Sequence, residues 1–309
     1  MCIRDSAYSA KDEELMVFVS DHIARAIENV RTEDRIRRQH QLVLEQKQAI
    51  TDSIKYARRI QKAVLPSQPY LDNILSDYFT IYKPKDILSG DYYWVREIEG
   101  FTVVIVADST GHGVPGALMS MLGITLLNEQ FRTFGIRPPG VILGHLRNKV
   151  KEILAQEGSV HEQQDGMDMA IVILDREKKE LQFAGANRPL FLFRKKELSA
   201  EAERLPYSSL ENKEYELYVI KGDKQPIVVH RDEQEFSNQT IQLLEEDSLY
   251  IFSDGFVDQY GGKKRKKFKT RNFKKLLLAI QDQSMEDQKA LLEEAFENWR
   301  GNNEQIDDV

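Results

Sequence analysis

Residues 103–122, VVIVADSTGHGVPGALMSML, join a buried strand to a helix through a glycine-rich loop. The apolar run ends at Asp108, and Pro115 occupies a favourable first position of the helix that follows. An aspartate at the end of a buried strand is desolvated, so it either binds a cation or caps a turn. The loop also presents backbone amides at a helix N-terminus, which suits an anion such as phosphate.

The same loop matches the G-x-G-x-x-G pattern of dinucleotide-binding folds through Gly111, Gly113 and Gly116. Two departures argue against that interpretation. Three residues separate the strand end from the first glycine, and the acidic residue expected about twenty positions later is at best Glu129, inside the helix.

Short strands and inserted helices follow on both sides of this segment. Strands are expected at 78–84, 101–108, 167–175, 181–186, 190–194, 216–220 and 248–254, with a polar hairpin loop at 175–180. Helices are expected at about 115–134, 140–156, 271–281 and 285–300. Strands in hairpin order with inserted helices predict an α+β sandwich rather than a doubly wound sheet.

Residues 12–65 contain neither glycine nor proline and predict one long helix. Apolar side chains recur seven residues apart at Ile36, Val43, Ile50, Ala57 and Val64. This spacing fits either a parallel coiled coil that joins a sensor to an effector or a surface helix packed on its own domain. The polar flanking faces and the length favour the coiled coil. Residues 15–30 are more apolar and break the seven-residue register.

The composition excludes several classes of protein. The only cysteine is Cys2, so neither an internal disulfide nor an internal cysteine nucleophile is available, and a reducing, cytoplasmic setting is expected. The net charge of −7 disfavours nucleic acid as a partner, and no apolar run is long enough to cross a membrane. The basic run at 263–269 is either a solvated loop or a docking patch for an acidic partner or phosphate.

Acidic residues stand beside glycines in other distant segments. Asp91 follows Gly90 in SGDYYW (89–94), Asp254 ends an apolar strand in SLYIFSDGFVDQYGG (248–262), and EQIDDV (304–309) carries Asp307 and Asp308. Oxygen-only ligands select Mg²⁺ or Mn²⁺ over Zn²⁺. Two such ions about 3.5–4 Å apart activate a water molecule for in-line displacement at phosphorus. The alternative is four unrelated turn aspartates.

Six motifs together, SGDYYW, VADSTGHGVPGALMSMLG, DGMDMAIVILD, AGANRPLFL, YIFSDGFVDQYGG and QIDDV, occur in the order of SpoIIE-like phosphatases. These are a bacterial branch of the metal-dependent type 2C (PP2C, or PPM) serine/threonine phosphatases, and the resemblance covers residues 60–309. It implies an α-β-β-α sandwich with two Mn²⁺ or Mg²⁺ ions between the sheets. Residues 15–30 resemble the closing helix of a GAF-type sensor domain.

The resemblance carries roles to individual positions. Asp91, Asp108, Asp254 and Asp307 match the metal-binding, catalytic aspartates, with Asp308 as second choice for the last. Ser109 stands where relatives offer a glycine carbonyl to the metal. Lys85 is expected to meet the substrate phosphate. Asp168 occupies a position that often carries a hydroxyl residue, and either a third, weak metal site or a structural hydrogen bond is expected there. His112 is expected to have a loop-structural role.

The resemblance also implies a division of labour along the chain. Residues 1–32 would be the end of a GAF-like sensor domain, 33–66 a coiled-coil linker helix, and 67–309 the phosphatase domain without its final strand. The substrate would be a phosphoserine or phosphothreonine on a STAS-type anti-sigma factor antagonist, and the helix would make a homodimer. The alternative is a catalytically inactive dimeric signalling module that binds a partner.

Overall fold

A computed structural model of the chain describes residues 9–155, 165–199 and 207–309. Two compact units divide after Tyr56, and the second begins at Ala57. Helix α1, Ala10–Val64, runs through the first unit and ends in the second. This confirms the long helix expected at 12–65.

Helix α1 leaves many apolar side chains uncovered within the described chain. Ile36, Val43 and Ile50 of the seven-residue seam are exposed, whereas Val64 packs against the core of the second unit. The boundary expected near residue 32 falls inside this continuous helix. No described helix is long and apolar enough to span a membrane.

The second unit contains two antiparallel sheets. Sheet A has the order β1-β2-β3-β4-β8, and sheet B has the order β6-β7-β5-β9. The strands of sheet A are β1 (Tyr92–Ile98), β2 (Phe101–Ser109), β3 (Met167–Asp175), β4 (Glu180–Ala186) and β8 (Gln239–Gln242). Those of sheet B are β5 (Leu190–Lys195), β6 (Ser208–Glu211), β7 (Tyr215–Ile220) and β9 (Ser248–Tyr250). The antiparallel neighbours of β2 exclude a dinucleotide-binding sheet, which requires parallel strands.

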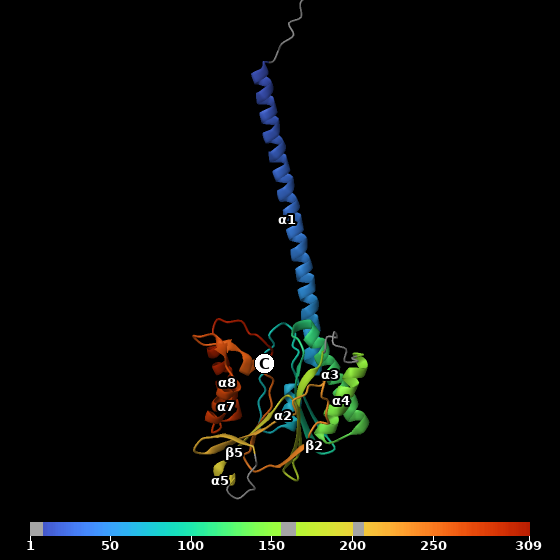
Figure 1. The fold of residues 1–309 in the computed structure, drawn as a ribbon, viewed down its shortest axis with the longest axis vertical. Helices are drawn as coiled ribbons and strands as arrows, with labels where there is room; N and C mark the ends of the chain where they lie inside the picture. Colours follow the sequence, from blue (N-terminus) through green and yellow to red (C-terminus); the bar gives the residue numbers. More distant parts are fainter. Residues whose placement is uncertain (1–8, 156–164, 200–206) are drawn as a thin grey trace, which may run out of the picture. The chain divides into compact units, whose positions relative to one another are not determined.

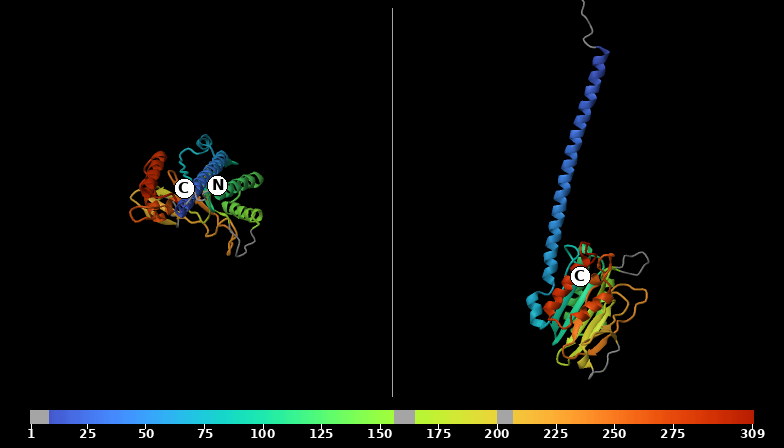
Figure 2. Two further views of the ribbon diagram at one scale, coloured as in Figure 1. Left: turned by 90° about the horizontal axis from the view of Figure 1, so that it is seen from above. Right: turned by 90° about the vertical axis from the view of Figure 1, so that its left-hand side faces the viewer.

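Helices cover the outer faces of both sheets, which gives the α-β-β-α layers expected from the sequence (Figures 1 and 2). Helices α3 (Gly113–Phe134) and α4 (Pro139–Ile153) pack on sheet A through a cluster that includes Ile105, Leu127 and Ile142. Helices α7 (Thr270–Ala279) and α8 (Met285–Arg300) pack on sheet B. A third cluster, which includes Phe183 and Leu192, lies between the sheets.

The two tryptophans of the chain lie in different layers. Trp94 of β1 is buried, stacks on Phe131 of α3 with ring centroids 4.8 Å apart, and donates a hydrogen bond to Asn128. Trp299 of α8 donates to the Gln259 carbonyl and meets the edge of the Phe268 ring at 5.4 Å. Each indole therefore belongs to one helix–sheet interface.

Residues 78–84, expected as a strand, form no strand in the structure. Their backbone pairs only at Lys83, which exchanges two hydrogen bonds with Val309. Phe79 and Ile81 pack against the core of sheet B, so burial rather than a ladder holds this segment. Strand β9 likewise stops at Tyr250 instead of reaching Asp254.

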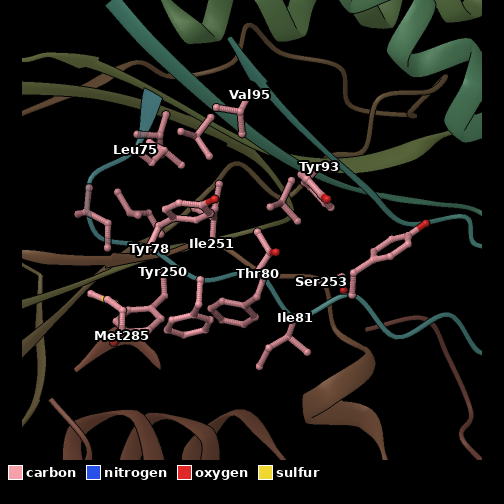
Figure 3. Close-up of a pocket in the computed structure, with 18 of the residues that line it drawn as sticks. Leu75, Tyr78, Thr80, Ile81, Tyr93, Val95, Tyr250, Ile251, Ser253 and Met285 are labelled. Atoms are coloured by element: carbon pink, nitrogen blue, oxygen red, sulfur yellow. The ribbon is translucent and has the colours of Figure 1, made fainter. Parts of the chain in front are cut away.

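A cavity of about 360 Å³ lies beside this segment, between the two sheets. Figure 3 shows Tyr78, Thr80 and Ile81 among the residues that line it, with Val95 of sheet A and Tyr250 of sheet B nearby. Its lining is mostly apolar, with Asp91 and Ser253 among the polar residues that line it.

Strands β1, β6 and β8 were not expected from the sequence, and neither were the remaining short elements. These short elements are α2 (Gln68–Ile74), α5 (Lys196–Ser199), α6 (Gly255–Asp258), and the hairpin of β10 (Tyr260–Gly261) with β11 (Lys266–Lys267). The hairpin carries the basic run, and Lys267 forms an ion pair with Asp258 at 2.7 Å. The four preceding basic residues, 263–266, are exposed.

Candidate metal centre

Three glycines bring the loop after β2 against the SGD segment. A Cβ atom on Gly116 would lie 2.3 Å from the Gly111 carbonyl oxygen, and one on Gly90 would lie 2.5 Å from the same oxygen. Gly111 itself has φ +80°, a conformation that favours glycine. The G-x-G-x-x-G spacing therefore serves a close backbone contact in this fold, and this contact places Asp91 near the end of β2.

Three carboxylates converge on one side chain, Arg188. Its Nη2 atom lies 2.7 Å from Asp108, 2.8 Å from Asp254 and 3.1 Å from Asp168. Asp108 and Asp168 are register partners on β2 and β3, whereas Asp254 precedes α6 after sheet B. The structure thus brings together two of the predicted aspartates, one in sheet A and one just before α6, and adds Asp168 to them.

The sequence analysis assigned no role to Arg188, although this residue lies inside the AGANRPLFL motif. The loop between β4 and β5 presents this arginine. Asn187 has φ +59°, donates its side-chain amide to Asp168 at 2.8 Å, and donates its backbone amide to the Asp223 carbonyl. A Cβ atom on Gly185 would lie 2.1 Å from the Arg188 carbonyl oxygen, so this loop packs closely on β4.

Asp91 is the most buried of the four predicted aspartates, Asp91, Asp108, Asp254 and Asp307. It is buried, its carboxylate interacts with the Ser253 hydroxyl, and its Oδ2 atom has no hydrogen-bond partner. Burial raises the pKa of Asp91, and the negative charge of Asp108 raises it further. A buried, unpartnered carboxylate oxygen among other carboxylates is a position that a cation would stabilise.

Burial also raises the pKa of Asp108. Arg188 opposes this effect, and the charges of Asp254, Asp307 and Asp168 add to it. Burial likewise raises the pKa of Asp307, and Asp254 contributes to the rise. The charge of Asp307 therefore acts on Asp108, and the charge of Asp254 acts on Asp307.

Asp308 has a different role. Its carboxylate is buried and accepts hydrogen bonds from the backbone amides of Lys85 and Gly90, each at 2.7 Å. Asp308 therefore fixes the 85–90 loop, whereas, among the described residues, this loop donates no hydrogen bond to the Asp307 side chain, whose Oδ1 accepts the Asp308 backbone amide at 3.0 Å.

The other candidates lie at the edge of the centre. Lys85 is close enough to Asp307 to lower the pKa of that carboxyl, against the larger effect of burial. Ser109 is buried, and its hydroxyl has no hydrogen-bond partner. His112 is half exposed, and its Nδ1 lies 2.7 Å from the Asp86 carboxylate, a contact that fits the loop-structural role expected for it.

The donor set fits a hard divalent cation, because it consists of carboxylate oxygens, one of them buried without a partner. Among residues 9–155, 165–199 and 207–309, however, no three acidic, histidine or cysteine side chains are grouped as a formed metal site would require. Three of the carboxylates surround Arg188 instead.

Comparison with known proteins gives one family and a consistent fold. The sequence profile of the family described as "Stage II sporulation protein E (SpoIIE)" matches residues 99–309. A search of curated proteins gave no match. The chain is similar to the SiaA-PP2C domain of Pseudomonas aeruginosa, with 28% identity and a TM-score of 0.70, over 85% of this chain and 95% of that one.

Two further structures share the fold at lower identity. One contains the RsbU and RsbW domains of Rv1364c from Mycobacterium tuberculosis, with 19% identity and a TM-score of 0.54. The other contains the PP2C phosphatase domain and a fragment of the regulatory domain of SpoIIE from Bacillus subtilis, with 18% identity and a TM-score of 0.52. Each match covers 74% of this chain, and 56% and 59% of those two chains respectively.

Proposed function

Because the chain belongs to the SpoIIE family of PP2C-type serine/threonine phosphatases, we propose that it removes phosphate from a phosphoserine or phosphothreonine of a regulatory protein. The proposed metal ligands are Asp91, Asp108, Asp254, Asp307 and the Ser109 carbonyl. One observation carries this proposal: Asp108 in sheet A and Asp254 just before α6 lie within hydrogen-bond distance of the same atom.

The bound ions, two Mn²⁺ or Mg²⁺, would supply an activated water and neutralise phosphate charge. The residues of the chain would orient the reactants. Lys85, beside Asp307, would bind a phosphate oxygen, and Asp308 would hold the Lys85 backbone in place through its 2.7 Å hydrogen bond. The Ser253 hydroxyl would fix the Asp91 carboxylate, leaving its second oxygen free.

The Asp254→Asn variant tests this function. It should abolish Mn²⁺-dependent phosphate release from a phosphoserine peptide, because an amide is a poor ligand for a hard cation. Asp258→Asn, four residues later, is the matched control, since Asp258 is more than a third exposed and forms an ion pair with Lys267. Equal turnover by Asp254→Asn and the unmodified chain would show that Asp254 is not a metal ligand needed for phosphate release.

The alternative is a catalytically inactive dimeric module that binds a partner. Titration calorimetry with Mn²⁺ separates the two functions, because an inactive centre that has lost its metals should give no binding heat. A chain that binds Mn²⁺ and releases phosphate supports the enzyme.

We further propose that the N-terminal helix regulates the phosphatase as part of a homodimer. The exposed seam of Ile36, Val43 and Ile50 has the spacing that a second copy of the helix would cover. Sedimentation equilibrium of a Val43→Asp variant tests this, and the variant should be monomeric where the unmodified chain dimerises. The sensor-domain origin of residues 1–32, the limits 33–66 and 67–309, the final strand and the cytoplasmic location stay predictions.

The end of α1 gives a physical route for such regulation. Gln61 is buried and donates its side-chain amide to the Ser89 carbonyl and to the Ser120 hydroxyl of α3, at 2.6 and 2.9 Å. Ser89 precedes Asp91 by two residues. A displacement of the helix end would therefore act on both segments that position Asp91 and Asp108. The substrate class that the family suggests is a STAS-type anti-sigma factor antagonist.

A further inference from the structure

We propose that Arg188 is a tethered counter-ion that occupies one cation position of the acidic centre and so limits the number of divalent ions that the centre holds. This inference rests on the proposed function, because it concerns the same carboxylates. It adds a residue to the centre that the sequence motifs did not identify.

The contacts of Arg188 differ from those of an ordinary arginine ion pair. A guanidinium group usually binds one carboxylate through two nitrogen atoms. Arg194 does this with Asp247, through Nε at 2.9 Å and Nη2 at 2.6 Å. In Arg188, the single Nη2 atom is shared among Asp108, Asp168 and Asp254. One positive atom at the meeting point of three carboxylates is the arrangement of a point cation.

The surrounding structure keeps the arginine in this position. Its side chain is 13% exposed, and its Nε atom is buried without a hydrogen-bond partner. The loop before it is fixed by the two Asn187 hydrogen bonds and by the close packing of Gly185 and Gly222 on the Arg188 carbonyl. The guanidinium is therefore delivered by a rigid backbone rather than by a mobile surface segment.

The position has a consequence for metal binding. Two of the three carboxylates that contact Arg188, those of Asp108 and Asp254, are proposed metal ligands. The third carboxylate, that of Asp168, is not among the proposed ligands. A divalent ion near this point would be repelled by a guanidinium that cannot lose its proton. Removal of the charge should open a further ion position between Asp168 and Asp254 and strengthen binding at the neighbouring ones.

Arg188→Gln tests the inference, with Arg132→Gln as the charge-matched control. Arg132 is exposed in the last turn of α3. Mn²⁺ is counted per protomer by equilibrium dialysis with elemental analysis, and free Mn²⁺ is followed by its electron paramagnetic resonance signal. Arg188→Gln should bind one more Mn²⁺ than the unmodified chain, and the half-saturating concentration should fall about tenfold or more. Arg132→Gln should match the unmodified chain.

Arg188→Lys keeps a positive charge at the same position and should retain the unmodified count, which separates charge from shape. If Arg188→Gln is less stable than the unmodified chain in the absence of metal, added Mn²⁺ should raise the melting temperature of the variant by more than it raises that of the unmodified chain. If Arg188→Gln binds as many Mn²⁺ ions as the unmodified chain and only its Michaelis constant rises, Arg188 is a phosphate ligand. That result would overturn this inference and leave the proposed function standing. No bound Mn²⁺ in any of these proteins would overturn the metal-dependent function as well.

Discussion

The Oδ2 atom of Asp308 lies 2.7 Å from the backbone nitrogen of Gly90, which donates a hydrogen bond to it across 218 residues of sequence. Because Oδ1 accepts a second amide hydrogen bond, from Lys85, the two oxygens of this buried carboxylate hold one loop. The adjacent Asp307 raises the pKa of Asp91 as Asp308 does, and its own pKa is raised by Asp254. Of the two neighbouring aspartates, Asp308 is therefore the one that holds the loop through its side-chain oxygens.

Asp308→Asn should destabilise the domain, because the amide group cannot accept both backbone hydrogen bonds. The expected loss is about 1–3 kcal/mol in the free energy of unfolding, measured by urea denaturation. Asp307→Asn should change stability by less than about 0.5 kcal/mol while it reduces Mn²⁺-dependent phosphate release. Equal destabilisation by the two substitutions would contradict this division of roles.

Gly116→Ala should disturb the loop after β2. The new Cβ atom would lie 2.3 Å from the Gly111 carbonyl oxygen and 2.9 Å from the Gly90 Cα atom, so the backbone must move. Overpacking of this kind costs about 1–3 kcal/mol, and phosphate release should fall with it because Asp91 follows Gly90.

Gly144→Ala provides the control for that substitution. Gly144 lies within α4, and a Cβ atom there would meet nothing within 4 Å. Alanine should therefore stabilise the helix by about 0.5–1 kcal/mol, as seen in the thermal midpoint. A loss of stability at both glycines would show that the close contact at Gly116 is not the cause.

Gln61→Leu should weaken the junction between the end of α1 and the SGD segment. The substitution removes the acceptor for the buried Ser89 amide and the 2.6 Å donor to the Ser89 carbonyl, which keeps only the longer 3.5 Å contact from the Ser120 hydroxyl. We expect a loss of about 1–3 kcal/mol and a change in basal phosphate release, measured together with thermal unfolding.

Gln48→Leu on the same helix is the matched control. Gln48 is exposed and contacts only Asp52 one turn later, an interaction worth about 0.2–0.5 kcal/mol. If the two variants behave alike in both measurements, Gln61 does not couple the helix to the loop.

Arg194→Met should be strongly destabilising, because it leaves the Asp247 carboxylate buried without its partner. Both side chains are 2% exposed, and loss of one member of such a pair costs about 3–5 kcal/mol. The measurement is the free energy of unfolding from chemical denaturation.

The adjacent pair of Lys195 and Glu246 supplies the comparison. Its side chains are 27% and 56% exposed, so Lys195→Met should cost no more than about 1 kcal/mol. Similar losses at the two neighbouring positions would mean that burial does not set the cost.

The parts of the fold that depend on strong local patterns were predicted from the sequence. Apolar runs placed β2, β3, β4, β5 and β7, and the glycine-free segment placed α1. The same patterns predicted Asp108 and Asp254 at the ends of apolar strands; Asp108 is the penultimate residue of β2, and Asp254 follows the end of β9 by four residues. A run of apolar residues dictates burial, and these strands are buried, so periodicity was sufficient.

The rest depended on contacts between distant segments. Arg188 follows Asn187, whose backbone has the left-handed conformation. In the sequence, this short loop looks like an ordinary turn, because the carboxylates that Arg188 contacts come from distant segments. Residues 78–84 have a strand-like composition, yet their side chains are buried by packing on sheet B without a ladder. The choice between Asp307 and Asp308 also required the partners of each carboxylate.

Because Trp94 contacts α3 and Trp299 belongs to α8, their fluorescence reports separately on the two helix layers of the domain. Trp94 emits from the interface of sheet A with α3, and Trp299 emits from the interface of α8 with the hairpin beside α6. Replacing one indole with phenylalanine leaves a single optical reporter. Spectral shifts in such proteins distinguish loosening on the side of α3 from loosening on the side of α8.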